Sequence, residues 1–183
     1  ALSLVGSEMC IRDRFIALDS EVTGVTFNNE LKSMNDLNII EYLYYYNGGG
    51  VALGDVNNDG LDDIFFSGNE VNDQLYLNQG NMVFKNISKS SGIANQNNWS
   101  TGASMADVNN DGFIDIYVST VSDYKNLKGH NRLYINNGDL TFTESSKKIG
   151  LDFEGFGTHA SFFDYDNDGD LDCLLYTSPS PRD

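Results

Sequence analysis

Three short segments rich in aspartate carry the residues most capable of chemistry. They are residues 55–63 (DVNNDGLDD), 107–115 (DVNNDGFID) and 164–172 (DYDNDGDLD), and each fits the pattern D-x-(D/N)-x-D-G-x-x-D. In a tight loop the side chains at positions 1, 3 and 5 can converge on one point, while glycine at position 6 tolerates a backbone conformation that other residues resist. Flexible sets of oxygen ligands suit Ca²⁺, because Mg²⁺ demands a stricter octahedron. The pattern therefore predicts one calcium site in each of these acidic loops.

The predicted ligands occupy the same positions in all three acidic loops: four side chains and the main-chain carbonyl that follows the glycine. They are Asp55, Asn57, Asp59, Asp63 and the carbonyl of Leu61 in the first loop; Asp107, Asn109, Asp111, Asp115 and the carbonyl of Phe113 in the second; and Asp164, Asp166, Asp168, Asp172 and the carbonyl of Asp170 in the third. The third loop has the most carboxylates, so charge alone predicts the tightest binding there. Without a cation these carboxylates repel one another, so metal binding should also stabilise the fold.

Two other interpretations of the acidic loops compete with that of a calcium site. An EF-hand loop begins in the same way but needs an acidic residue at position 12 and a helix on each side. Position 12 is Phe66, Val118 or Leu175, and the flanking residues are typical of strands, so this alternative is excluded. The second alternative is an ordinary solvated turn, since Asp, Asn and Gly dominate turns. Three loops with ligands at the same four places favour metal sites over turns.

The acidic loops belong to longer internal repeats. They recur about every 50–60 residues, a period typical of propellers and other repeat folds. Residues 75–80 (LYLNQG) match residues 133–138 (LYINNG), and each match is followed by an aromatic residue, Phe84 or Phe142. The second repeat is longer because of residues 122–130, which we predict to be an inserted loop.

Each repeat contains several short apolar runs separated by turn residues. In the first repeat they are residues 50–53, 64–66, 75–77 and 82–84; in the second, residues 133–135 and 140–142 flank a glycine-containing hairpin turn. Four short strands per repeat are typical of a β-propeller blade. The sequence thus predicts an all-β fold, namely a partial β-propeller of four-stranded antiparallel sheets. The predicted blades lie around residues 48–92 and 101–150, with a truncated third blade around residues 158–172. Residues 15–47 are interpreted as strand material of an earlier or shared blade.

The two ends of the chain do not share this organisation. Residues 1–14 and 173–183 show neither periodicity nor turn signals, and they resemble translated sequencing-adapter sequence. We interpret both as artefactual or disordered tails, which leaves residues 15–172 as the repeat region. Cys10 and Cys173 then carry no functional prediction, and the absence of a signal peptide from this segment has no bearing on export.

Composition narrows the function further. The net charge of −16 excludes nucleic acid and anionic membranes as partners, because both are bound through Lys and Arg. No apolar run approaches the roughly 20 residues of a membrane span, so we predict no membrane insertion in this segment. No nucleophile elbow or phosphate-binding loop is present, which indicates a protein without catalytic residues. The tyrosines at 44–46 and Trp99 could line a sugar site, but packing is the favoured interpretation.

Residues 47–60 (NGGGVALGDVNNDG), 99–102 (WSTG) and 162–170 (FFDYDNDGD) resemble the FG-GAP/VCBS repeats of the integrin α-subunit propeller and of bacterial surface proteins. More closely, they resemble the ASPIC/UnbV group, which is related to cartilage acidic proteins. The resemblance implies a secreted or cell-surface propeller that binds Ca²⁺ and presents loops to a protein or glycan ligand in adhesion. Propellers need about 4–8 blades, so we predict that this chain is a fragment.

One other function stays open, and a third is disfavoured. The alternative function is that of a scaffold propeller in a larger secreted enzyme, polysaccharide-active or biosynthetic, whose catalytic part lies elsewhere. An intracellular scaffold is disfavoured, because extracellular calcium modules commonly bind at about 10⁻⁴–10⁻³ M and cytosolic calcium is too scarce for such sites.

Overall fold

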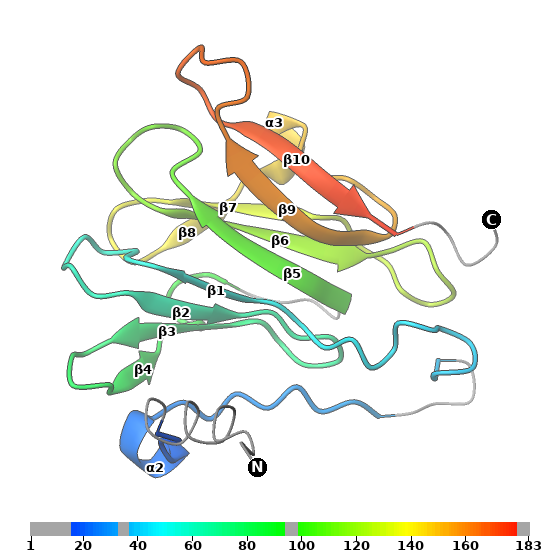
Figure 1. Cartoon of the computed structure of the whole chain (residues 1–183), viewed down its shortest axis with the longest axis horizontal. Coiled ribbons are helices and arrows are strands. Elements are labelled where there is room, and N and C mark those ends of the chain that lie inside the picture. The colour runs from blue at the N-terminus through cyan, green and yellow to red at the C-terminus, as the bar shows by residue number, and fades with distance from the viewer. Residues whose placement is uncertain (1–15, 33–36, 94–98, 179–183) are drawn as a thin grey trace, which may run out of the picture.

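The computed structural model describes residues 16–32, 37–93 and 99–178, and this part of the chain is all-β, as predicted. Two four-stranded sheets and one two-stranded sheet stack side by side (Figure 1). The first sheet contains β1 (Val51–Gly54), β2 (Asp63–Phe66), β3 (Gln74–Asn78) and β4 (Phe84–Asn86). The second contains β5 (Trp99–Ala106), β6 (Asp115–Val121), β7 (Arg132–Asn136) and β8 (Phe142–Glu144), and the third contains β9 (Gly157–Phe163) and β10 (Asp172–Thr177).

Each four-stranded sheet is an antiparallel meander, in which every strand pairs with its neighbour in sequence. This arrangement confirms the prediction of four strands per repeat, and we call these sheets the first and second blades. The outer strands begin later than expected, at Phe84 and Phe142. The reason is a longer hairpin turn: Met82 and Leu140 have φ of 61° and 65°, a left-handed conformation that a strand cannot contain.

The main core lies between the first and second blades. Apolar side chains from both blades form one cluster that includes Phe65 and Leu75 from the first blade and Ile116 and Val118 from the second. A smaller cluster, with Tyr117, joins the second blade to β9 and β10. Because the second blade is covered on both faces, every residue of β6 is buried. Fully burying one large apolar side chain contributes about 1.5–3 kcal/mol, so these two boundaries hold the stack together.

The first strands of the three sheets, β1, β5 and β9, approach one another closely. A Cβ atom added to Gly102 would lie 2.3 Å from the main-chain oxygen of Thr158, and one added to Gly50 would lie 2.7 Å from the nitrogen of Ala103. Thr101 also donates from its hydroxyl group to the oxygen of Gly157, 2.7 Å away. Glycine at these positions therefore allows neighbouring sheets to pack backbone against backbone.

The segment before β1 differs from the prediction of strand material. Its described residues form the short helix α2 (Ser20–Thr23), an extended stretch and a series of turns, with no strand. Phe27 stacks on Phe66 at 4.8 Å between ring centroids, which places this segment against the outer face of the first blade. Tyr42 and Tyr45 are both buried beside Trp99. Burial of residues three apart requires a turn, since a strand would alternate them.

The predicted boundary at residue 173 is also corrected. Residues 173–177 lie within β10, which pairs with β9 along its length. Cys173 and Leu175 pack towards the second blade, whereas Leu174 and Tyr176 are exposed, so the strand has two distinct faces. The third acidic loop needs this return strand to close. The predicted N-terminal tail at residues 1–14, with Cys10, lies outside the described residues.

A loop and a short helix connect the remaining strands. The predicted inserted loop at residues 122–130 lies between β6 and β7. The short helix α3 (Ser146–Ile149) follows β8 and ends at Gly150, whose φ is 82°. No helix in the described ranges is long and apolar enough to cross a membrane.

Candidate metal centres

The three acidic loops lie at the same end of the stack. Each connects the first two strands of its sheet: β1 to β2, β5 to β6, and β9 to β10. In Figure 1 they are the tips at the left and top of the molecule. The three sets of predicted ligands therefore lie on equivalent loops of neighbouring sheets.

In the first loop the side chains organise the backbone. Asp55 accepts hydrogen bonds from the main-chain nitrogens of Asp59 (3.1 Å) and Gly60 (2.7 Å). Asp59 accepts one from the nitrogen of Leu61 (2.9 Å), and its second oxygen faces the side-chain amide of Asn57 at 3.0 Å. Gly60 has φ of 87°, as expected for a glycine at position 6. The predicted side-chain ligands at positions 1, 3 and 5 thus face one another around the turn.

The other two loops repeat this geometry. Asp107 accepts from the nitrogens of Asp111 (3.0 Å) and Gly112 (2.8 Å), and Asp164 accepts from those of Asp168 (3.2 Å) and Gly169 (3.1 Å). The nitrogens of Phe113 and Asp170 donate to the preceding aspartates, Asp111 and Asp168, as Leu61 does in the first loop. Position 4 is left-handed in each case: Asn58, Asn110 and Asn167 have φ of 59°, 56° and 60°.

The last aspartate of each loop has a second, structural task. Asp63 is fully buried and accepts main-chain hydrogen bonds from Val56 (2.9 Å) and Asn78 (2.7 Å). Asp115 is equally buried and accepts from Val108 (3.0 Å) and Asn136 (2.8 Å). Asp172, in the third loop, is exposed and accepts from Tyr165 at 2.9 Å. These carboxylates tie each loop to its own sheet.

The carboxylates influence one another electrostatically. Burial raises the pKa of Asp63 above its ordinary value, and repulsion from Asp59 and Asp55 adds to the effect. Burial, with repulsion from Asp111 and Asp107, likewise raises the pKa of Asp115. For Asp55, burial acts in the same direction, but hydrogen bonds from Gly60 and neighbouring main-chain nitrogens outweigh it and lower the pKa. A cation placed among these groups would relieve the repulsion.

The third loop gives the clearest geometric fit to a metal ion. Carboxylate oxygens of Asp164, Asp166 and Asp172 all lie within 4.8 Å of one another. Calcium binds oxygen at about 2.3–2.6 Å, so two ligands on opposite sides of one ion are at most about 5.2 Å apart. These three oxygens are thus close enough to share an ion. No other set of three His, Cys, Asp or Glu side chains meets this criterion in the described part of the chain.

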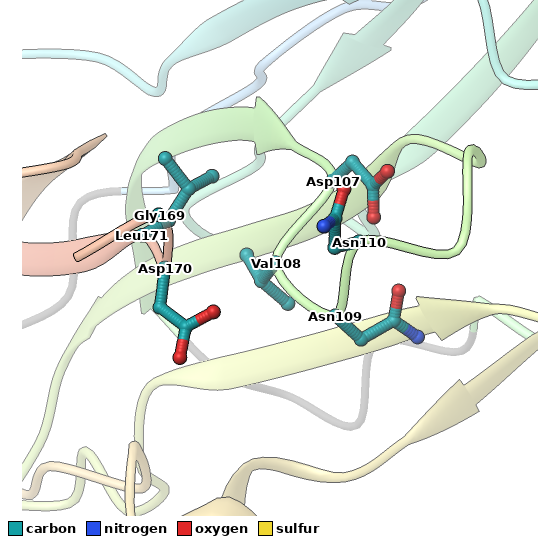
Figure 2. A pocket seen from close by; sticks show the side chains of 7 residues that line it. All are labelled: Asp107, Val108, Asn109, Asn110, Gly169, Asp170 and Leu171. Atoms are coloured by element: carbon teal, nitrogen blue, oxygen red, sulfur yellow. The ribbon is translucent and has the colours of Figure 1, made fainter. Parts of the chain in front are cut away.

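A cavity of about 590 Å³ separates the second loop from the third. Figure 2 shows Asp107, Val108, Asn109 and Asn110 on one side, and Gly169, Asp170 and Leu171 on the other. The cavity is open to solvent and brings predicted ligands of two loops to a common surface.

Sequence reasoning missed two asparagines that support the loops. Asn78 and Asn136 end β3 and β7, and each places its main-chain nitrogen on the buried aspartate of its loop. Their side chains also donate to the loop backbone, Asn78 to the oxygen of Asp62 (2.9 Å) and Asn136 to that of Ile114 (3.1 Å). The available signal was their recurrence at the same place in the matching segments at residues 75–80 and 133–138.

The aromatic residues considered for a sugar site are mostly part of the core. Trp99 and Tyr45 are buried, with 1% and 0% exposure. With Tyr42 and Tyr124 they form a cluster at the opposite end of the stack from the acidic loops. The packing interpretation is confirmed for Trp99 and Tyr45, whereas Tyr46 is exposed.

Stacked antiparallel blades, each with an acidic loop between its first two strands, define a class of repeat protein. The chain belongs to the FG-GAP-like repeat family, whose model matches residues 55–118 and 120–175. The first matched segment runs from the first acidic loop into β6, and the second runs from the end of β6 into β10, so each crosses a boundary between sheets.

The chain is also similar to curated proteins named cartilage acidic protein 1. It is 29% identical to that of Xenopus tropicalis over 144 residues, 74% of this chain and 21% of the relative. It is 30% identical to the mouse protein over 135 residues, 72% of this chain and 20% of the relative, and 26% identical to the human protein over 168 residues, 89% and 24%. The chain thus spans less than a quarter of the length of these relatives.

Proposed function

We propose that this chain is a calcium-stabilised, non-catalytic interaction module that works outside the cell or on its surface. The observation that carries the proposal is the repetition of one acidic loop at the same end of three neighbouring sheets. Asp164, Asp166 and Asp172 support calcium as the ion, because their oxygens lie within the reach of a single Ca²⁺.

The residues that would hold the ion in each loop are the side chains at positions 1, 3, 5 and 9, with the carbonyl at position 7. When bound, calcium would supply the positive charge that the loop lacks. The protein's own part is to position the ligands: Gly60 and its equivalents shape the turn, and Asp63 and Asp115 anchor the first two loops to buried main-chain nitrogens. Binding would therefore stabilise the junction between the first two strands of each sheet.

Chemistry and the relatives support the proposed location and partner. The similar proteins are named for cartilage, a tissue made largely of extracellular matrix. Loops of this kind in extracellular modules bind calcium at about 10⁻⁴–10⁻³ M, a range that suits calcium outside the cell. The net charge of −16 favours a basic protein surface or a neutral glycan as partner.

Calcium titration of the full chain tests the proposal. After removal of calcium with EGTA, we expect calorimetry to give one equivalent per acidic loop and the melting temperature to rise as calcium is added. Magnesium should bind more weakly. The control is the triple variant Asp55→Asn, Asp107→Asn, Asp164→Asn, which should lose binding in all three loops. A folded wild-type chain that binds no calcium would overturn the proposal.

A further inference from the structure

The side chain of Asn136 connects the first acidic loop to the second. Its amide nitrogen donates to the main-chain oxygen of Val56 in the first loop, at 2.8 Å, and to that of Ile114 in the second loop, at 3.1 Å. Its side-chain oxygen accepts from the nitrogen of Gly138 at 3.0 Å. Asn136 is 2% exposed, so these bonds lie in a buried boundary between two blades, where a lost partner is costly.

Two contacts of Asn136 lead to predicted calcium ligands. Val56 uses its main-chain nitrogen to hold Asp63 at 2.9 Å, while its oxygen is held by Asn136. The main-chain nitrogen of Asn136 holds Asp115 at 2.8 Å. A continuous series of hydrogen bonds therefore runs from Asp63 through Val56 and Asn136 to Asp115. The buried carboxylates of the two loops are thus linked through hydrogen bonds.

A second bridge joins the exposed tips of the same two loops. The side-chain amide of Asn58 donates to the main-chain oxygen of Gly112 at 2.9 Å. The nitrogen of Gly112 in turn donates to Asp107, the first ligand of the second loop, at 2.8 Å. Ordering of either tip by an ion would thus restrict the other.

Equivalent positions elsewhere in the described part of the chain lack these bridges between loops. Asn78 makes the same contacts as Asn136 within its own loop, to Asp62, Asp63 and Gly80, but among the described residues it makes none to a neighbouring loop. Within the described ranges, no side-chain hydrogen bond joins the second loop to the third, where Asn110 lines the open cavity of Figure 2 instead. Bridging is therefore particular to the first and second loops.

We propose that the first and second acidic loops are coupled calcium sites, and that Asn136 and Asn58 transmit the coupling. An ion in one loop fixes backbone that the other loop must order before it can bind, so the second ion meets a smaller entropic cost. The coupling is reciprocal, because each site must change the affinity of the other by the same factor. This inference rests on the proposed function, since calcium is the ligand at both sites.

The test measures the affinity of the second loop with and without a working first loop. All chains carry Asp164→Asn and Asp166→Asn, so that the third loop does not contribute. The first loop is disabled by Asp55→Asn with Asp59→Asn, and calcium affinity is measured by calorimetry. We expect disabling the first loop to weaken the second by at least about fivefold, the lower range of ordinary coupling.

The bridging residues are then changed in the same background. With Asn136→Ala or Asn58→Ala, disabling the first loop should have a smaller effect on the second, and with both substitutions it should have none, whereas the matched control Asn78→Ala should keep the full coupling. Melting curves without calcium check that each variant is folded, and Asn58→Ala, an exposed position, serves if Asn136→Ala does not fold.

Equal affinity of the second loop in the presence and absence of the first would overturn the coupling and leave calcium binding intact. Absence of calcium binding in the unmodified chain would overturn both proposals.

Discussion

The carboxylate of Asp73 lies 4.0 Å from a guanidinium nitrogen of Arg132, across the buried boundary between the first and second blades. Asp73 is 1% exposed and accepts hydrogen bonds from the nitrogen of Gly68 (2.8 Å) and the hydroxyl of Ser100 (3.2 Å). Burial raises its pKa to about 6, although these neighbours act in the opposite direction. The boundary between the blades therefore contains an acid that resists ionisation.

The raised pKa predicts a pH dependence of stability. An acid with a higher pKa in the folded state binds its proton more tightly there, so its contribution is most favourable at low pH and is lost as pH rises to about 6. Relative to Asp73→Asn, the wild-type free energy of unfolding should fall by up to about 3 kcal/mol between pH 4 and pH 7. Urea unfolding of both chains across this range measures the difference. The exposed Glu154→Gln serves as control and should show no such trend.

Asp63 and Asp59 should respond differently to substitution, although both are predicted calcium ligands. Asp63→Ala leaves the buried nitrogens of Val56 and Asn78 without an acceptor, which should cost about 2–5 kcal/mol even without calcium. Asp59 is exposed, so Asp59→Ala should weaken calcium binding with little effect on the calcium-free chain. Denaturant unfolding in EGTA compares the two. Equal stabilities would refute the anchoring role of Asp63.

Two buried serines at the blade boundaries provide a matched pair. The hydroxyl of Ser119 has no hydrogen-bond partner among the described residues, whereas that of Ser100 donates to Asp73. Ser119→Ala should therefore be neutral or stabilising by up to about 1 kcal/mol, because it removes an unpaired polar group. Ser100→Ala should destabilise by about 1–3 kcal/mol. Thermal melts of both variants measure the contrast, and a large loss on Ser119→Ala would reveal a partner for its hydroxyl.

The third loop should bind calcium most tightly. It has an aspartate at position 3, Asp166, where the first two loops have asparagine. Asp166→Asn should weaken its affinity by about tenfold, since ligand charge tunes such sites. Tyr165 at position 2 allows a selective readout: it should sensitise the luminescence of Tb³⁺ bound in this loop, and Tyr165→Phe should abolish that signal. An unchanged midpoint in the Asp166→Asn titration would count against the charge argument.

The repeated parts of the fold could be predicted from sequence, because loop and strand motifs recur in register. The two copies of the motif at residues 75–80 and 133–138 indicate equivalent strands in two repeats. The three acidic loops indicate three sheets, each with such a loop between its first two strands. The segment before β1 has no repeat partner, and its tyrosines favour strands locally. Packing of Tyr42 and Tyr45 against Trp99 overrides that preference.

For the candidate site, the pattern located the predicted ligands but did not reveal the residues that support them. An aspartate at position 9 has the same sequence signature whether it faces an ion or accepts buried main-chain nitrogens, as Asp63 and Asp115 do. Contacts between blades are set by how the sheets stack, so the role of Asn136 could not be read from its own repeat. The hairpin turns extend through Met82 and Leu140, whose left-handed backbone no local residue type signals.

The meander of each blade has a consequence for the order of folding. Strands that are neighbours in sequence close short loops at low entropic cost, and folds rich in local contacts form quickly. A blade can therefore assemble as soon as its own segment is synthesised, before the next is complete. The acidic loop closes the first hairpin of each sheet, so the repulsion among its carboxylates must be overcome at the start of that blade's folding. The ionic environment in which the chain emerges would then set how fast each blade begins to fold, as refolding rates at increasing calcium concentration would measure.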